Sequence, residues 1–593
     1  MKTTTLLSRT PGSLGKSLAR SFGLPLPLLL VASLAASPAR AETAPAAAIP
    51  DVEPARAQLD SKLRFRNAPI VSAVTDVRRV PRPAVNPFDR GAYFFDAYVG
   101  KRAVRSLSPQ PADRAGGVNA LDEVPDGSWF ENRIGARPLS PEELIHRSGS
   151  APRLPFTVVG SKLGGVSPGM RVRDAKGDGF LLKFDAAGDP VAETASDVVV
   201  QRLLWTVGYH TPDDNIVFFS RGDLRIDARA SVKDATGSEH RMTEADLSRI
   251  LRHVDQRADG SYRGLTSRLL PGKPVGGFPQ DGVRKDDAND VVAHADRRDV
   301  RGARVFFAWL NNADVKEDNT LDTWIEDPRT PGRGTIRHHL VDFGNSLGAW
   351  GWRHDQSVGF TQGLDYGDGA RALVSFGLWR RPWERVQSSP LLGVGNLESA
   401  LFNPAGWTSR YPWVPFERFD RFDGAWGARI LMRISPAHIA AAVSEGRYPD
   451  AAAEAYVTRT LIERQRKLGW HYLTQTSPLE RFEVSAEPAA GNSLCFDDPL
   501  LIHFARDHQL LQATTRHRVA TWDFAGRPLP LQLERAGAER VCIEGIALPA
   551  DHDGYTIVDI ETARPGIATN RILVHIARDP ASHQPRVIGL RRL

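Results

Sequence analysis

The sequence predicts an α+β protein: a mixed body followed by a C-terminal β-sandwich. From about residue 151 to 477, apolar strand-like runs alternate with segments of helical periodicity. From about residue 478 the pattern changes to short apolar runs separated by turns rich in Gly, Pro and Asp. The chain of 593 residues is too long for a single core, so we expect two to four domains.

Composition and charge exclude several classes of protein. Apolar residues make up 41% of the chain and charged residues 25%, which excludes wholesale disorder and a polytopic membrane protein. The formal net charge is +6, but residues 1–41 contain five basic residues and no acid, which leaves the remainder close to neutral. We therefore expect no nucleic-acid partner. Two cysteines are too few for a disulfide-dense scaffold or for a Cys-ligated zinc or iron–sulfur site.

Residues 1–41 have the parts of an export signal. Basic residues come first, an apolar stretch follows from residue 22 to 36, and Ala39-Arg40-Ala41 is a small-x-small cleavage site. The apolar stretch is short for a spanning helix and contains two prolines, although an uncleaved anchor is the alternative interpretation. We expect cleavage near Ala41 and an exported protein, periplasmic or secreted, whose mature chain has no transmembrane segment.

The two cysteines, Cys495 and Cys542, leave two interpretations open. In an oxidising compartment they could form a disulfide across 47 positions of sequence, which would contribute about 4 kcal/mol in the chain-entropy account. Two unpaired buried thiols are the other interpretation. Neither cysteine is near the cleavage site, which excludes a lipoprotein.

Shifts in composition divide the chain into five parts. We expect a signal peptide over 1–41, a linker and irregular N-terminal extension over 42–150, two parts of the body over 151–225 and 226–477, and the β-sandwich over 478–593. The second body part includes a tryptophan-rich insertion within residues 350–426. Core packing is the better explanation for these tryptophans, and ligand stacking is the alternative.

Periodicity predicts the individual elements of the body. Apolar runs predict strands over 156–159, 179–184 and 216–219. Helices are predicted over 189–208, 244–254 and 300–310, and again within 435–475. Asp498-Pro499 predicts a short helix inside the C-terminal region, because Pro favours the first helical position.

Residues 311–348 hold the most informative arrangement of polar side chains. Asp314 is followed five positions later by Asn319, and a strand-like run then ends in Asp342-Phe343-Gly344. In phosphoryl transfer one Asp accepts or orients the attacking hydroxyl, while an Asn and a second Asp hold Mg²⁺ against the phosphate oxygens. A tight loop would place Asp314 beside Asn319, and the next hairpin would bring Asp342 opposite them. Taken singly, each is also explained as a turn residue.

Upstream residues extend this arrangement. Gly160, Gly164 and Gly165 lie in a glycine-rich loop, Lys183 lies on the strand that follows, and Glu193 lies at the start of the next helix. Each has a simpler explanation as well. The glycines suit plain turns, the lysine suits a strand edge, and the acid is favoured by the dipole of the first helical turn.

In this order of motifs the sequence resembles the protein-kinase-like superfamily over about residues 151–475. Asn312-Ala313-Asp314 stands where ordinary protein kinases have His-Arg-Asp, and an Asn-x-Asp-x4-Asn loop is more similar to HipA-type kinases and, more distantly, to phosphoinositide kinases. The resemblance implies a two-lobed catalytic body that binds ATP with Mg²⁺ or Mn²⁺. It implies catalytic roles for Asp314, Lys183, Glu193 and Lys316, nucleotide contacts for Gly160, Gly164, Gly165 and Lys183, and metal ligation for Asn319 and Asp342. By the same resemblance, Glu193 would hold Lys183 in place.

Two sequence distances and a pair of adjacent histidines near this site lead to further expectations. The distance from Lys183 to Asp314 requires an insertion around residues 225–290, and the prolines and glycines after residue 327 predict an enlarged hairpin before Asp342. His338-His339 suggests a metal site, but adjacent strand residues point to opposite faces. Packing of the strand is the better explanation for these histidines.

We therefore expect an exported kinase-like phosphotransferase that moves a phosphoryl or nucleotidyl group from Mg-ATP to an unidentified protein or small-molecule acceptor. The alternative is a catalytically inactive pseudokinase that acts as an envelope binding protein through its C-terminal β domain, because ATP is scarce outside the cytoplasm. Retention of Lys183, Asp314, Asn319 and Asp342 favours the enzyme. A third interpretation, an envelope hydrolase, has no recognisable nucleophile or metal set.

Overall fold

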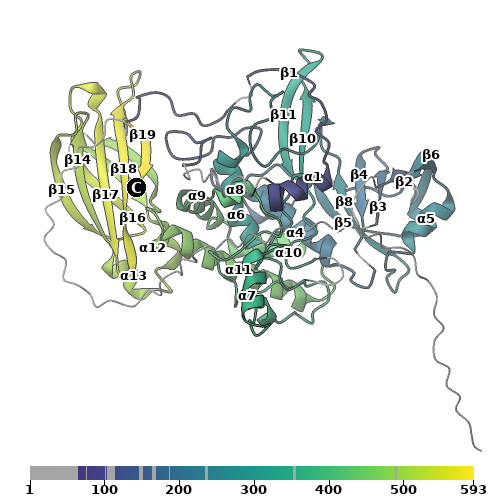
Figure 1. Ribbon diagram of the computed structural model, residues 1–593. Coiled ribbons are helices and arrows are strands. Elements are labelled where there is room, and N and C mark those ends of the chain that lie inside the picture. Colours follow the sequence, from purple (N-terminus) through teal and green to yellow (C-terminus); the bar gives the residue numbers. More distant parts are fainter. Residues whose placement is uncertain are drawn as a thin grey trace, which may run out of the picture. The chain divides into compact units, whose positions relative to one another are not determined.

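The computed structural model describes residues 64–74, 77–100, 102, 114–145, 151–162, 168–185, 187–233, 238–350, 355–487 and 491–593. The predicted signal peptide, the linker up to residue 63, and Gly164 and Gly165 lie outside these residues. The chain divides into two units, 1–58 and 59–593, and all described residues belong to the second. This unit is mixed α+β with several sheets and a strand-rich C-terminal region, as the sequence predicts (Figure 1).

The first sheet carries Lys183 and has seven strands. In sheet order these are β5 (Asp214–Phe219), β8 (Tyr262–Arg268), β4 (Gly179–Lys183), β3 (Gly169–Arg173), β2 (Phe156–Ser161), β6 (Leu224–Lys233) and β7 (Glu239–Arg241). Apolar side chains of β2, β3 and β4 pack against Leu247 and Leu251 of helix α5 (Glu244–Leu251). Strand β6 crosses the boundary expected at residue 225, and residues up to 268 complete this sheet rather than forming a separate insertion.

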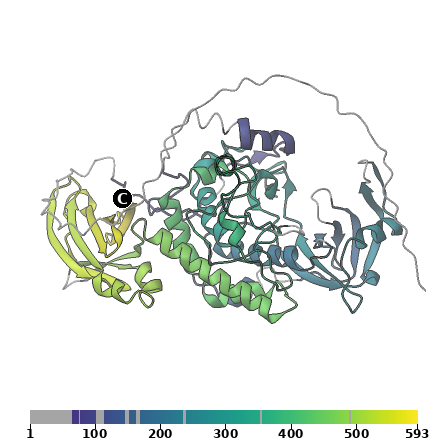
Figure 2. The same ribbon diagram turned by 60° about the horizontal axis from the view of Figure 1, so that its bottom comes forward.

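Most other helices of the body build one large apolar core. The helices that build this core are α3 (Pro141–Ile145), α4 (Ala192–Val207), α6 (Arg298–Trp309), α8 (Val414–Glu417), α9 (Arg421–Leu431), α10 (Pro436–Ser444) and α11 (Ala451–Leu473), the long light-green helix of Figure 2. The body also has helices α1 (Arg90–Phe95) and α7 (Tyr366–Val374). Trp309 of α6 and Trp426 of α9 are fully buried in this core. Gly302 lets the two helices approach, because a Cβ there would lie 2.6 Å from the Trp426 ring. No helix in the described part of the chain is both long and apolar enough to cross a bilayer.

Helix α4 confirms the helix predicted after Lys183, with a later start. It begins at Ala192 because Val191 has a φ of 97°, outside the helical region. It ends at Gly208, whose φ of 143° and close approach to Phe130 both require glycine, since a Cβ would lie 2.4 Å from that ring. The segment between these ends is almost wholly buried, so α4 is fixed against both the sheet and the helical core.

A second, four-stranded sheet contains the predicted hairpin. Its order is β1 (Val80–Pro81), β11 (Arg333–Leu340), β10 (Thr320–Glu326) and β9 (Lys273–Pro274). Strands β10 and β11 pair antiparallel, with Thr320 opposite Leu340. The hairpin thus starts just after Asn319 and ends just before Asp342, as the spacing predicts.

The two histidines of β11 are packing residues. His338 Nδ1 lies 2.7 Å from Asp322 Oδ1, and its ring stacks on Trp129 with centroids 3.6 Å apart. His339 Nδ1 lies 3.0 Å from the Leu321 carbonyl oxygen. No group of three or more His, Cys, Asp or Glu within the described residues is arranged to hold a metal ion.

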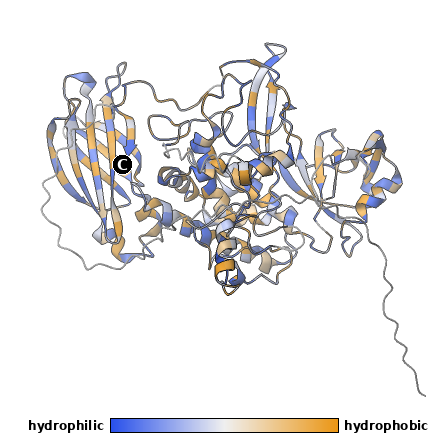
Figure 3. Cartoon of the chain, viewed as in Figure 1, coloured by the Kyte–Doolittle hydropathy of each residue, from blue (hydrophilic) through white to orange (hydrophobic). Residues whose placement is uncertain are grey.

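The strand-rich C-terminal region contains two sheets that share an apolar core. One has β12 (Glu480–Glu487), β13 (Gly491–Asp497) and β16 (Arg540–Ile546), and the other has β15 (Pro528–Ala536), β14 (Arg516–Asp523), β17 (Thr556–Arg564), β18 (Ile567–Arg578) and β19 (Pro585–Arg592). Leu494 and Ile543 of the first sheet pack with Ile560 and Val574 of the second. Orange and blue segments alternate along several of these strands in Figure 3, as expected where one strand face is buried.

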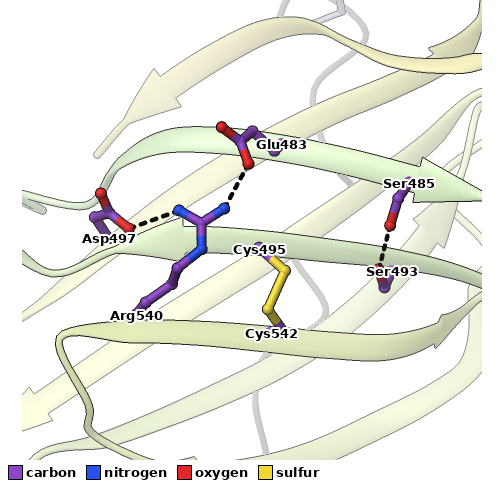
Figure 4. The surroundings of a disulfide bond; sticks show 7 residues. All are labelled: Glu483, Ser485, Ser493, Cys495, Asp497, Arg540 and Cys542. Atoms are coloured by element: carbon purple, nitrogen blue, oxygen red, sulfur yellow. Dashed lines mark hydrogen bonds and ion pairs between the residues drawn. A yellow bond between two sulfur atoms is a disulfide. The ribbon is translucent and has the colours of Figure 1, made fainter.

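Two short helices and a disulfide complete the C-terminal region. Helix α12 (Pro499–Phe504) begins after Asp498 as predicted, and α13 (Gln509–Thr514) follows it. Cys495 and Cys542 face each other on β13 and β16 and form a disulfide (Figure 4). Of the two interpretations that the sequence leaves open, the structure therefore has the disulfide and not two unpaired thiols. Arg540, on the same strand as Cys542, forms ion pairs with Asp497 of the neighbouring strand β13 and with Glu483 of β12, the strand beyond it in the sheet.

Candidate functional site

A cavity of about 850 Å³ brings together most of the predicted site residues. The first sheet, helix α4, the loop after α6 and the segment after β11 all contribute to its wall. Its lining includes the predicted residues Lys183, Glu193, Asp314, Lys316, Asn319 and Asp342. Residues far apart in sequence meet here: Lys183 and Asp342 are 159 positions apart and in direct contact.

Lys183 ends strand β4 and bridges two carboxylates. Its Nζ donates to Asp197 Oδ2 at 2.9 Å and to Asp342 Oδ1 at 3.0 Å. The side chain of Lys183 is 11% exposed and that of Asp197 only 3%. Burial alone would lower the pKa of Lys183, but the charges of Asp197, Asp342 and Asp214 raise it above its ordinary value. The ammonium therefore stays charged throughout the physiological range.

The helix carboxylate that holds Lys183 is Asp197, whereas the resemblance assigned this role to Glu193. The two acids lie on α4, one helical turn apart and on the same face. Asp197 also accepts the backbone N–H of Phe343 at 2.9 Å, so it ties the sheet, α4 and the segment after β11 together. Glu193 lies half-buried in the first turn, on the cavity wall. The available signal for Asp197 was a lone acid directly before three consecutive valines.

Asp342 presents an ionised carboxylate to the cavity. Its φ is +64°, in the left-handed region that non-glycine residues rarely adopt. The side chain is 51% exposed, although one oxygen accepts from Lys183. The charge of Lys183 lowers the pKa of Asp342 to about 2 against an opposing effect of burial, and Lys162 and Lys316 add to the lowering. Asp342 is therefore available as an anionic oxygen ligand at neutral pH.

Asp314 is held in one orientation by its neighbours. Its Oδ1 accepts from Lys316 Nζ at 2.6 Å and its Oδ2 from Asn345 Nδ2 at 2.9 Å. Asn319 Nδ2 donates to the Asp314 backbone carbonyl at 2.7 Å, which closes the loop and leaves the amide oxygen of Asn319 as an acceptor. The sequence motifs did not identify Asn345, although it directly follows Asp342-Phe343-Gly344.

A further buried carboxylate lies within the electrostatic reach of Lys183. Asp214, on β5, is 1% exposed, and its Oδ1 has no hydrogen-bond partner within the described residues. Burial raises the pKa of Asp214 to about 7, and the charge of Asp197 adds to this effect. Burial also raises the pKa of Asp197, against the opposing charge of Lys183. Three carboxylates therefore share one ammonium group.

The structure explains Gly160 without a phosphate contact. Gly160 lies in β2, at a register irregularity with both neighbouring strands, β3 and β6. A Cβ there would lie 2.5 Å from a guanidinium nitrogen of Arg171. Gly160 is not among the described residues that line the cavity, so packing of the strands accounts for it.

The loop that follows Gly160 nevertheless reaches the cavity. It joins β2 to β3, which pair antiparallel, and its described residues Lys162 and Pro168 line the cavity. Burial, followed by the charge of Lys183, lowers the pKa of Lys162. Gly164 and Gly165, predicted to contact the nucleotide, lie outside the described residues, so their role stays a prediction.

The N-terminal extension supplies a wall that the sequence did not predict. Phe88, Arg90 and Phe94 line the cavity, and the Phe94 ring lies 4.9 Å from that of Tyr411. This segment is fixed to the loop between α6 and β10 by Asn86, whose Nδ2 donates to Glu317 Oε1 at 2.7 Å. The aromatic run at residues 93–95 was the available signal within an otherwise irregular region.

Comparisons with known proteins add no family to this geometry. No protein-family model, no curated protein and no solved structure matches the chain. The cavity itself is therefore the guide to function: Lys183 is shared by Asp197 and Asp342, and Lys316 pairs with Asp314. Asn319 and Asp342 add oxygen-bearing side chains to the same cavity wall.

Proposed function

We propose that this protein is a kinase-like phosphotransferase that uses ATP with Mg²⁺ or Mn²⁺. The observation that carries the proposal is the bridge from Lys183 to Asp197 and Asp342, which lines one cavity with Asp314 and Asn319. In the proposed two-lobed body, the smaller lobe is the seven-stranded sheet with α4, extending beyond residue 225 to 268. The larger lobe is the helical core up to residue 477.

The oxygen donors of the cavity fit a magnesium ion carried by a nucleotide. Mg²⁺ is commonly bound through one or two carboxylates together with phosphate oxygens rather than by an all-protein cage. Asp342 offers a half-exposed, ionised carboxylate, and Asn319 offers its amide oxygen. The bound metal would neutralise charge on the phosphate oxygens during transfer.

Each charged side chain then has a distinct role in transfer. Asp314 would orient the acceptor hydroxyl and take its proton, while the hydroxyl oxygen bonds to the γ-phosphorus and the bond to the β-phosphate oxygen breaks, releasing ADP. Lys183 would contact the phosphates and Lys316 the transferred group, since both are cationic donors. Asp197 would keep Lys183 in place. Nucleotidyl transfer would use the same groups: the hydroxyl oxygen would bond to the α-phosphorus while the bond to the bridging oxygen of the β-phosphate breaks, releasing pyrophosphate.

We propose that the protein acts outside the cytoplasm, in the periplasm or as a secreted protein. The disulfide between Cys495 and Cys542 supports this location, because such bonds persist in oxidising compartments. Residues 1–41 support this location independently, because basic residues, an apolar stretch and a small-x-small cleavage site follow one another there.

A catalytically inactive pseudokinase is the second candidate, and one observation favours it. Both carboxylate oxygens of Asp314 are engaged, by Lys316 and Asn345, and its side chain is 7% exposed. A carboxylate that already accepts a hydrogen bond on each oxygen, one of them from an ammonium group, is a weaker base toward a hydroxyl. In this second function the chain would bind a nucleotide without turnover and contact partners through its strand-rich C-terminal region.

The first test is thermal unfolding of the protein with and without ATP and Mg²⁺. Nucleotide at a hundred times its dissociation constant adds about 2.7 kcal/mol to stability, which is readily seen as a rise in Tm. Asp342→Ala should abolish this rise, because it removes the carboxylate that faces both Lys183 and the metal. Asp318→Ala is the matched control: it removes an exposed carboxylate of the same cavity to which we assign no role.

Asp314→Asn separates the enzyme from the pseudokinase. The variant should keep the nucleotide-dependent rise in Tm but lower turnover, measured as ADP release, by about 10²-fold or more. A native protein that shows the rise without any turnover would be the pseudokinase. Absence of any rise with either Mg²⁺ or Mn²⁺ would refute both functions.

A further inference from the structure

Helix α7 and the turn after it expose a group of large apolar side chains. Leu373, Val374, Phe376 and Leu378 are 79%, 79%, 95% and 84% exposed. Helix α7 itself, labelled in Figure 1, has no buried residue along its nine positions. Single exposed apolar residues are ordinary, but several together mark a surface that meets a partner. We call residues 366–385 the α7 tip.

The α7 tip is also rich in arginine. It contains Arg371, Arg380, Arg381 and Arg385 against two acids, Asp368 and Glu384. Both acids are already paired with Arg381, at 2.8 and 3.5 Å. Arg380 and Arg385 are exposed and form no ion pair with other described residues. The surface therefore offers uncompensated positive charge directly beside its apolar side chains.

Internal hydrogen bonds hold the tip in this form. Asp365 accepts the backbone N–H of Asp368 at 2.9 Å and caps the start of α7. After the helix, Trp379 donates its backbone N–H to Ser375 Oγ at 3.0 Å and its indole N–H to Asp368 at 3.0 Å. The polar groups of the turn are thus used within the tip, while its apolar side chains point into solvent.

We propose that the α7 tip binds the surface of a lipid bilayer that contains anionic headgroups. The apolar side chains would enter the boundary between headgroups and acyl chains, where Trp and Tyr are also favoured. Arg380 and Arg385 would meet lipid phosphates. A free anion would account for the arginines but not for Phe376, and an apolar protein groove would leave the arginines uncompensated. The proposal does not depend on the proposed transferase activity.

The test places an environment-sensitive dye at the tip. Phe376→Cys gives a single reactive thiol, because within the described residues no cysteine is free. Leu510→Cys is the matched control, since Leu510 on α13 is 75% exposed. Each labelled full chain is mixed with vesicles of phosphatidylcholine alone or with an equal part of phosphatidylglycerol. We expect the emission at position 376, but not at 510, to shift to the blue with the anionic vesicles.

Second variants decide whether the arginines act as proposed. Arg380→Glu with Arg385→Glu should weaken vesicle binding, read from the dye at position 376, by roughly tenfold or more. Their Tm should match that of the parent, because neither side chain is buried. The proposal is overturned if the dye at 376 ignores anionic vesicles, if position 510 responds equally, or if reversing the arginines has no effect. It is also overturned if unlabelled protein shifts the dye without vesicles, which would identify a second copy of the chain as the partner.

Discussion

Replacing Asp197 is the most direct test of how the cavity is built. Asp197→Ala removes two hydrogen bonds of 2.9 Å, one from Lys183 Nζ and one from the Phe343 backbone N–H. A hydrogen bond to a charged group contributes about 1.5–3 kcal/mol, and removal of one partner of a buried ion pair costs about 3–5 kcal/mol. Lys183 keeps its contact with Asp342, and the cost of burying Asp197, visible in its raised pKa, disappears. We therefore expect a net loss of about 3 kcal/mol.

Two further variants test whether the loss of stability in Asp197→Ala comes from its contact with Lys183. Asp197→Asn keeps the size of the side chain and an oxygen that can accept one of the two hydrogen bonds, so its loss should be about half as large. Glu193→Ala removes a half-buried acid of the same helix face. It should cost less than about 1 kcal/mol, as expected for a partly solvated charge. The order of the three variants distinguishes the carboxylate that holds Lys183 from the one that the resemblance suggests.

Stability should be measured for individual segments rather than for the whole chain, because a chain of this size need not unfold in one step. Hydrogen exchange followed by mass spectrometry reports the opening of individual segments. A loss of about 3 kcal/mol corresponds to roughly 100-fold faster exchange at the Phe343 amide in Asp197→Ala. Unchanged exchange in that variant, or equally fast exchange in Glu193→Ala, would refute the assignment of Asp197.

Three further predictions concern pH, the disulfide and maturation. The pKa of Asp214 is about 7 when folded against 3.8 for a free side chain, so the folded state binds the extra proton and native stability falls as pH rises from about 4 to 7. Asp214→Asn should gain stability relative to the native protein across that window, and a constant difference in thermal unfolding would contradict this. Reduction of the Cys495–Cys542 disulfide, which spans 47 positions, should lower the stability of the C-terminal region by about 4 kcal/mol. Denaturation of Cys542→Ala should then be insensitive to reductant. Exported material should begin at Glu42 in N-terminal sequencing, whereas an intact Met1 on membrane-bound protein would contradict cleavage.

Local sequence patterns predicted many of the helices and strands, but not which strands pair within each sheet. Helix α5 begins after Thr243 and α12 after Asp498, where capping side chains and proline predict a start. The β10–β11 hairpin follows from its turn residues. The continuation of the first sheet through β6 and β8 could not be predicted, because strand pairing depends on contacts far apart in sequence.

The residues of the candidate site also fall into those that the sequence could predict and those that it could not. Asp314, Asn319 and Asp342 could be found because they lie in short motifs that resemble those of protein kinases, and the spacing of a loop and a hairpin predicts that they meet. Asp197 and the N-terminal wall at Phe88 could not, because their positions depend on packing between distant segments. Gly160 is a different case: its contact with a nucleotide stays a prediction, and strand packing already explains it, because a Cβ there would approach the Arg171 guanidinium and the Ser231 backbone carbonyl.

The paired charges of the cavity determine what a ligand must bring. Lys183 contacts Asp342, and Lys316 contacts Asp314. Either lysine can move to a phosphate only if its carboxylate is left with water or finds another cation, and leaving a charge without a partner in a partly desolvated cleft is costly. ATP alone supplies only anions and would leave Asp342 uncompensated. ATP with a divalent metal supplies anionic oxygens for Lys183 and a cation for Asp342 at the same time. The proposed function therefore requires the rise in Tm to depend on metal and nucleotide together, and a rise with ATP in the absence of metal would point to a simple anion site around the lysines.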